Sequence, residues 1–192
     1  MSLERIYTRI WRCLAAATGE GPQPFKAMQV ATVGLDGGPD VRTVLLRSVC
    51  EAENLLTFHT DLRSPKVAAL SWDPRIALVA VDTERNLQIR VRGEARVLRD
   101  GPARLDAWNS SDDRSLVAYR TLLAPGSPVS QPSDVFGAQP GIPGPDEGLK
   151  HFCVVEVHPT SLDWLDLSDG DHPERAHFVR TAEKWVSSWI AP

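Results

Sequence analysis

The strongest constraint on the fold lies between Met28 and Leu98, where short apolar runs alternate with tight turns. The runs with strand character are residues 30–33, 41–49, 55–60, 76–81 and 87–98. The first two flank Asp36-Gly37-Gly38-Pro39, which is typical of a hairpin turn. Helices do not alternate regularly with these runs, which disfavours a parallel sheet built from βαβ units. The segment therefore predicts an antiparallel, mainly β fold.

Helical spacing is confined to a few places. At the N-terminus the apolar positions are Leu3, Ile6, Ile10 and Leu14, so residues 1–24 read as a helix followed by a linker. Ser64 before Pro65 is typical of the start of a short helix. Residues 103–123 predict a longer helix. The chain thus has two or three expected helices.

The C-terminal half returns to strand character after a long interruption. Residues 124–148 contain six prolines and no periodicity, which is typical of a functional or disordered loop. Strands are expected at 151–157 and 162–167, and a strand or hairpin at 178–190. Gly93 interrupts an alternating strand and is a candidate β-bulge. Residues 1–192 therefore predict one domain with six to eight antiparallel strands.

Composition narrows the classes of function. The net charge of −4 lacks the basic excess of a general nucleic-acid binder. No apolar run reaches the roughly 20 residues of a membrane helix, and the charged N-terminus does not resemble a signal peptide. Three cysteines and five histidines show no disulfide or metal spacing. We expect a cytoplasmic protein with reduced thiols, no metal, and neither a nucleic-acid nor a membrane partner.

The best candidate site is the stretch Arg63-Ser64-Pro65-Lys66. Free N–H groups and a partial positive charge at a helix start bind phosphate readily. Lys66 adds a full charge, Arg63 is a candidate for a second, and Arg42 on a neighbouring strand offers a guanidinium fork. The alternative is a capped surface helix with solvated basic residues.

Two further features are open to more than one interpretation. Gln88, Arg90 and Arg92 project from one face of a strand and could donate hydrogen bonds to a flat ring, or form a solvated sheet face. The tryptophans that could stack on an aromatic ligand, or pack in the core, are Trp108, Trp164, Trp185 and Trp189. No nucleophile elbow or dinucleotide fingerprint is present in the sequence, so catalytic residues stay unassigned.

These features follow one another in the order of a known family. Residues 30–47, the pattern Phe58-His59-Thr60-Asp61 with Ser64 and Lys66, and the strand from Gln88 to Gly93 resemble motifs of the pyridoxamine 5′-phosphate oxidase family. The closing residues that match are Trp164, Arg175, Phe178, Trp185, Ala191 and Pro192. The resemblance covers most of the chain from Met28 onward.

The resemblance implies an FMN-binding split β-barrel, with FMN held noncovalently at a homodimer interface. Arg42, Thr43, Val44, Leu45 and Arg47 would line the flavin. His59, Thr60, Ser64 and Lys66 would hold the phosphate end together with Arg42, and Gln88 would contact the polar edge of the isoalloxazine. Trp164 and Arg175 would come from the partner subunit.

The substrate motifs of the family are replaced in this chain. Its oxidases hold the substrate phosphate with Tyr, Arg and Ser, where this chain has Ala107, Ser111 and Ser115. An Arg-Leu-His segment is replaced by Asp171-His172-Pro173. The resemblance therefore favours an FMN-dependent oxidoreductase of unknown substrate. The alternatives are a genuine pyridoxamine 5′-phosphate oxidase, a non-catalytic flavin-binding or sensing protein, and a scaffold without flavin.

Overall fold

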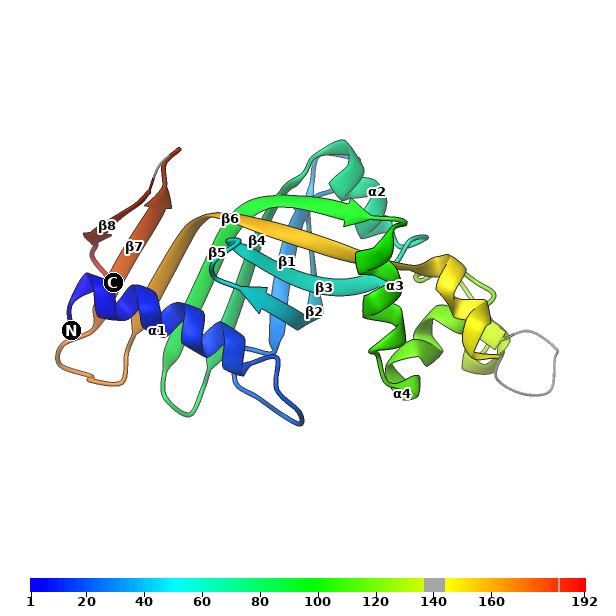
Figure 1. Cartoon of the computed structure of the whole chain (residues 1–192), viewed down its shortest axis with the longest axis horizontal. Coiled ribbons are helices and arrows are strands. Elements are labelled where there is room, and N and C mark those ends of the chain that lie inside the picture. The colour runs from blue at the N-terminus through cyan, green and yellow to red at the C-terminus, as the bar shows by residue number, and fades with distance from the viewer. Residues whose placement is uncertain (137–143, 183) are drawn as a thin grey trace.

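The computed structural model of the chain describes residues 1–136, 144–182 and 184–192 (Figure 1). Its strands are β1 Ala27–Val33, β2 Pro39–Cys50, β3 Leu55–Asp61, β4 Arg75–Asp82, β5 Leu87–Leu98, β6 Phe152–Asp166, β7 Glu174–Arg180 and β8 Trp185–Trp189. Its α-helices are α1 Leu3–Ala16, α2 Pro65–Trp72, α3 Pro102–Asn109 and α4 Asp113–Leu116. Short 3-10 helices span Val117–Arg120 (η1), Pro132–Phe136 (η2) and Pro145–His151 (η3).

All eight strands belong to one antiparallel sheet, in the order β3-β2-β1-β4-β5-β6-β7-β8. β3 pairs with β2 on one side and with β6 on the other, so strands β1 to β6 close into a barrel. β7 and β8 continue the sheet from β6 beyond the barrel, at the opposite end of the molecule from α3 and α4 (Figure 1). The predicted mainly β split-barrel fold is confirmed.

The barrel interior is filled by alternate residues of each strand. On β5, Leu87, Ile89 and Val91 are buried while the residues between them face outward. The helix α1 covers one opening, and its inner side chains Ile6, Ile10, Trp11 and Leu14 are at most 2% exposed. This period of two on the strands and three or four on the helix is what the sequence predicts for a sheet closed by one amphipathic helix.

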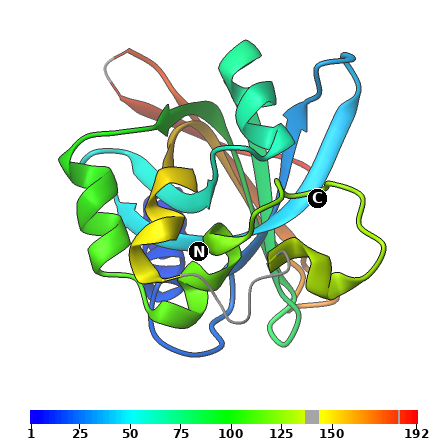
Figure 2. The ribbon, with the colours of Figure 1, turned by 90° about the vertical axis from the view of Figure 1, so that its right-hand side faces the viewer.

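A second, smaller core holds the helical end of the molecule (Figure 2). It consists of Trp108, Leu116, Tyr119, Phe152 and Val154. Arg104 fastens it, because its Nε donates to the carbonyl of Phe152 at 2.8 Å and its Nη2 donates to the carbonyl of Leu149.

The expected helix over 103–123 is wrong as a single element. α3 ends at Asn109, and Asp112 then begins α4 by accepting a hydrogen bond from the backbone N–H of Ser115 at 2.9 Å. Ser and Asp side chains compete for backbone groups and favour helix starts over helix interiors. The sequence Ser110-Ser111-Asp112 therefore divides the segment into two helices and a 3-10 turn.

The expected strands at 151–157 and 162–167 are one continuous strand, β6. The register between β5 and β6 shifts at Gly93, as predicted, but the extra residue is Thr160 on β6, between partners Pro159 and Ser161. The bulge accommodates Pro159, which cannot donate a ladder hydrogen bond. The 178–190 segment is a hairpin of β7 and β8 that begins earlier, at Glu174.

The Pro/Gly-rich stretch 124–148 is more ordered at its ends than expected. It contains η2 and the start of η3, while residues 137–143 lie outside the described part. In the described part of the chain, no helix is long and apolar enough to cross a membrane.

Gly93 permits the close approach of β5 and β6, so adding a methyl group there should destabilise the barrel. A Cβ at Gly93 would lie 2.9 Å from the carbonyl carbon of His158 and closer still to its oxygen. We expect Gly93→Ala to lower the free energy of unfolding of the apoprotein by about 2 kcal/mol in urea titrations. Gly170→Ala is the matched control, because no atom lies within 4 Å of that position. Equal stabilities of the two variants would contradict the packing constraint.

Candidate functional site

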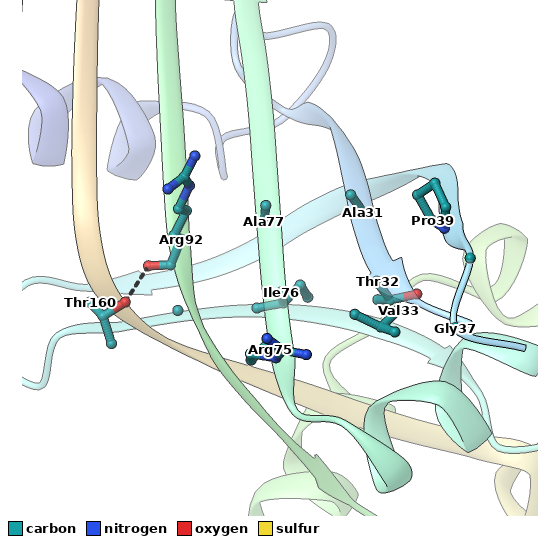
Figure 3. Close-up of a pocket in the computed structure, with 12 residues that line it drawn as sticks. Ala31, Thr32, Val33, Gly37, Pro39, Arg75, Ile76, Ala77, Arg92 and Thr160 are labelled. Carbon is teal, nitrogen blue, oxygen red and sulfur yellow. Dashed lines mark hydrogen bonds between the residues drawn. The ribbon is translucent and has the colours of Figure 1, made fainter. Parts of the chain in front are cut away.

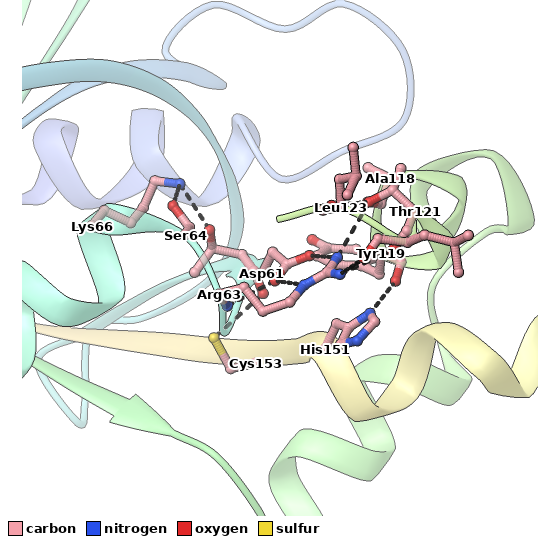
Figure 4. Close-up of polar contacts among 12 residues, drawn as sticks. Asp61, Arg63, Ser64, Lys66, Ala118, Tyr119, Thr121, Leu123, His151 and Cys153 are labelled. Atoms are coloured by element: carbon pink, nitrogen blue, oxygen red, sulfur yellow. Dashed lines mark hydrogen bonds and ion pairs between the residues drawn. The ribbon is translucent and has the colours of Figure 1, made fainter. Parts of the chain in front are cut away.

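The first part of the site lies where β3 ends and α2 begins (Figure 4). The Lys66 ammonium donates to the hydroxyl oxygens of Thr60 at 3.0 Å and Ser64 at 2.8 Å. Both hydroxyl residues are buried, with exposed fractions of 6% and 4%. Ser64 occupies the N-cap position as predicted, but its side chain faces Lys66 and makes no capping hydrogen bond. The turn therefore gathers one ammonium and two hydroxyls in a single corner.

Arg42 supplies a second cation to this corner. Its Nη1 donates to Thr32 Oγ1 at 2.7 Å, and its Nη2 forms an ion pair with Asp40. Burial, and then the charge of Arg42, lower the pKa of Lys66. Within the described residues Lys66 has no ion pair of its own, so the corner has an excess of positive charge that suits an anion.

Arg63 does not join this corner, contrary to its status as a candidate phosphate contact. Its side chain extends away from Lys66 toward the segment after η1, where it contacts Thr121 and Leu122 (Figure 4). Its counter-ion is the buried carboxylate of Asp61, at 2.7 Å. The sequence shows the charge of Arg63, but its partners become visible only in the fold.

A pocket of about 500 Å³ lies beside β2 and β3 and is bordered by α3. Among its lining residues are Arg47, His59, Ala107, Ser111 and Glu156. A register shift between Leu46 and Ser48 leaves Arg47 as the extra residue of β2. Such a bulge redirects a side chain, and here the side chain borders the pocket. The Arg47 Nη2 donates to Ser115 Oγ at 3.4 Å, its one hydrogen bond within the described residues.

His59 is neutral in this pocket at physiological pH. Burial, followed by repulsion from Arg47, lowers the pKa of His59 to about 4. Its ring packs edge-on against Phe152 with a centroid distance of 4.8 Å. The residue therefore provides a polar, uncharged wall between the pocket and the second core.

The residues of β2 between the two cations alternate across the sheet. Val44 is packed in the barrel core, whereas Thr43 and Leu45 lie on the outer face, and Leu45 is 44% exposed. Their side chains therefore do not line a common cavity.

The remaining predicted residues lie elsewhere. Gln88 and Arg175 face outward on β5 and β7, and their strands pair with the same residue of β6, Leu165. Arg175 forms an ion pair with Asp163 at 3.0 Å. Gln88, with its amide oriented to satisfy both groups, accepts a hydrogen bond from the Nε of Arg90 at 2.8 Å.

Trp164 is fully buried in the barrel core, where the guanidinium carbon of Arg9 lies 4.9 Å from the ring centroid. Its ring is thus enclosed by its own chain. In one chain, the corner of Arg42 and Lys66 is separated by β1 and β4 from the face that carries Gln88 and Arg175.

A second pocket, of about 530 Å³, lies on the outer face of β1, β4 and β5 (Figure 3). It is lined by small and apolar residues such as Ala31, Ala77 and Pro39, with Arg75 and Arg92 at its border. Exposed Val41, Leu45 and Val81 extend this apolar surface over β2 and β4. A continuous apolar sheet face of this kind is typical of an interaction surface.

The sequence interpretation missed Thr32, whose hydroxyl orients Arg42. The strand pattern could have indicated it. Thr32 lies on the buried face of β1, two residues after Val30, which pairs with Arg42 on β2. In the described residues, no group of three or more His, Cys, Asp or Glu has the geometry to hold a metal ion.

Comparisons with known proteins agree with this arrangement. Residues 8–99 match the family model described as pyridoxamine 5′-phosphate oxidase, FMN-binding domain. A pyridoxine/pyridoxamine 5′-phosphate oxidase of Hyphomonas neptunium is 32% identical over 93% of this chain and 83% of its own. Its counterpart in Thermosynechococcus vestitus is 35% identical over 96% and 86%.

A solved structure extends the likeness to the whole fold. A pyridoxamine 5′-phosphate oxidase-related, FMN-binding protein of Nostoc punctiforme superimposes with a TM-score of 0.81, over 100% of both chains at 26% identity. The barrel, the motif residues and these relatives together show that the chain belongs to the pyridoxamine 5′-phosphate oxidase family of FMN-binding split-barrel proteins.

Proposed function

We propose that the protein is an FMN-dependent oxidoreductase in which Arg42, Thr60, Ser64 and Lys66 hold the FMN phosphate. The observation that carries this proposal is the Lys66 ammonium, which contacts two buried hydroxyls and lies near Arg42 without an ion pair of its own in the described part. A phosphate dianion would supply the missing negative charge and accept hydrogen bonds from the same groups. FMN, when bound, supplies the capacity to accept electrons from a substrate.

Arg47 is the residue we assign to the reacting end of the site. It borders the pocket beside β2, and most of its guanidinium N–H groups are free of partners in the described residues. A cation near the flavin ring stabilises negative charge that develops on reduction. The neutral His59 adjoins it without adding a competing charge.

We propose that two chains complete each site. Gln88 and Arg175 face away from the phosphate corner of their own chain, on the outer sheet face that also carries the apolar surface of β1, β2 and β4. Two-fold pairing through that surface would let these residues approach the partner's corner. The burial of Trp164 favours a supporting role beneath this face rather than direct contact with flavin.

The substrate pocket has little capacity for a phosphate group. Ala107 and Ser111 stand where the family's oxidases have Tyr and Arg, and both line the pocket with Arg47. The Ser111 hydroxyl donates to the carbonyl of Ala107 at 2.7 Å. The carboxylates that border the same pocket are those of Glu53, Asp112 and Glu156. We therefore propose a substrate other than a vitamer phosphate.

The runner-up is a genuine pyridoxamine 5′-phosphate oxidase, which is favoured by the names of the relatives and by Ser115, where the resemblance keeps the serine of the substrate site. Asp171, which replaces an expected arginine, lies between β6 and β7 and is exposed. We propose a cytoplasmic location because Cys13, Cys50 and Cys153 are free thiols, which fit a reducing compartment.

Removing either of the two cations that face the proposed phosphate site should lower the affinity for FMN far more than the affinity for riboflavin. Lys66→Ala and Arg42→Ala each remove a charge-assisted contact, worth about 10- to 100-fold in affinity for FMN. Fluorescence titration of the apoprotein with both flavins measures the ratio. Arg5→Ala is the control, because that side chain is exposed on α1 and has no ion pair in the described residues. Equal weakening of both flavins would show that the phosphate is held elsewhere.

Mixed dimers should recover FMN binding from two deficient chains. Chains with Lys66→Ala and chains with Arg175→Ala each lack one half of the proposed site. After subunit exchange, about a quarter of all sites combine both intact halves. Flavin absorbance after desalting measures the recovery, and light scattering reports the dimer. A monomer saturated with FMN, or no recovery after demonstrated exchange, would refute the shared site.

Vitamer phosphates should be poor substrates of the FMN-saturated protein. The loss of two phosphate contacts reduces substrate affinity on the order of a thousandfold. Oxygen consumption with pyridoxine and pyridoxamine 5′-phosphate measures this, and the double variant Ala107→Tyr, Ser111→Arg should gain activity. Turnover of the unmodified protein near one per second, with micromolar substrate, would promote the runner-up. If no electron donor of any class is oxidised, a non-catalytic flavin-binding or sensing role replaces the oxidoreductase.

A further inference from the structure

All hydrogen-bond donors of the Arg63 guanidinium are engaged within the protein. An arginine has five N–H groups. Those of Arg63 face Asp61 Oδ1 at 3.0 Å, Asp61 Oδ2 at 2.7 Å, the carbonyls of Thr121 and Leu122 at 2.9 and 3.1 Å, and Thr121 Oγ1 at 3.2 Å. None is left to contact a phosphate.

The two ends of this contact belong to different parts of the fold. Asp61 is the last residue of β3, and Arg63 lies in the turn between β3 and α2 that also carries Ser64. Thr121 and Leu122 follow η1, in the helical end of the molecule. The carboxylate of Asp61 is buried, and removing one partner of a buried ion pair leaves an uncompensated charge. The contact is therefore costly to break.

A second set of hydrogen bonds, which runs through His151, joins the same turn to the same helical end of the molecule. The backbone N–H of Leu62 donates to the carbonyl of His151 at 2.6 Å. His151 Nδ1 in turn donates to the carbonyl of Tyr119 at 2.9 Å, two residues before Thr121. The turn is thus held to the helical end at two adjacent points (Figure 4).

The chain contains the same local motif without these outer contacts. Asp73 and Arg75 have the same spacing, the same fork and the same backbone hydrogen bond to the carboxylate as Asp61 and Arg63. The Arg75 side chain, however, is 74% exposed. The difference between the two pairs lies in the acceptors that Thr121 and Leu122 provide.

We propose that Asp61 and Arg63 are positioning residues, which act through Ser64 and Lys66 to hold the FMN phosphate and do not touch it. The pair fixes the turn against the helical end of the molecule, so that the hydroxyl and the ammonium point into the same corner. This inference rests on the proposed phosphate site at Lys66.

Removing the charge of Asp61 distinguishes an electrostatic effect on the phosphate from a positioning role, because the two predict opposite changes in FMN affinity. Asp61→Asn removes a negative charge near the phosphate, so a purely electrostatic role predicts unchanged or tighter FMN. A positioning role predicts weaker FMN, because the fork that holds Arg63 is lost. Arg63→Lys keeps the charge but cannot satisfy the five acceptors, so it should behave like Asp61→Asn.

The experiment titrates full-length apoprotein variants with FMN and with riboflavin. We expect Asp61→Asn and Arg63→Lys each to weaken FMN by about tenfold and riboflavin much less. Asp73→Asn, the matched control at the other end of α2, should leave both affinities unchanged. Thr121→Val, a milder variant that retains the ion pair, should weaken FMN by about threefold.

The possible outcomes separate this inference from the proposed site. If Lys66→Ala weakens FMN selectively but Asp61→Asn does not, the positioning role is wrong and the phosphate site stands. If Lys66→Ala has no selective effect, the phosphate site is wrong. Equal loss of both flavins in the Asp61 and Arg63 variants would show that the pair supports the fold in general. If those two variants fail to fold, an unchanged ratio in Thr121→Val overturns the proposal.

Discussion

The double pairing of β3 is the constraint on which the rest of the structure depends. Because β3 pairs with both β2 and β6, the sheet closes and every strand of the barrel acquires a buried and an outer face. The end of β3 at Asp61 then fixes where the chain turns into α2, and with it the position of Lys66. The same strand presents Thr60 to the corner of Arg42 and Lys66, and His59 to the neighbouring pocket. One strand thus positions both a cationic corner and a neighbouring pocket that is bordered by Arg47 and by carboxylates.

The corner of Arg42 and Lys66 and the pocket beside Arg47 differ in the charges that border them. In the corner, Arg42 and Lys66 each donate to hydroxyls of their own, and an anion relieves the repulsion between the two cations. In the pocket, Arg47 stands among carboxylates and alanines. Our proposal assigns the corner to the phosphate of FMN and the pocket to a substrate that has no phosphate group.

Features that depend on residues close together in the sequence were predicted well, whereas features that depend on distant residues were not. Strands β1 to β5 were predictable because their period of two and their turns are local. The break at Ser110-Ser111-Asp112 was missed because the apolar residues on its two sides, such as Trp108 and Leu116, are two helical turns apart, although the helix start at Asp112 has a sequence signal. Arg42 and Lys66 were matched by motif and lie together, whereas the position of Gln88 beside Arg175 depends on barrel topology. Arg63 was misjudged because its acceptors on Thr121 and Leu122 lie 58 and 59 residues away in sequence.

The hairpin beyond the barrel has a consequence for behaviour in concentrated solution. β8 pairs with β7 on one side, and its other side has no strand partner in the described part of the chain. Its Val186 and Trp189 are 49% and 48% exposed. An open strand edge with apolar side chains can add to the edge of another molecule and extend into a ribbon. β8 is only five residues long, which limits such growth. In the described residues, each barrel strand has a partner on both sides, so edge-to-edge association beyond the proposed dimer should begin at the hairpin of β7 and β8.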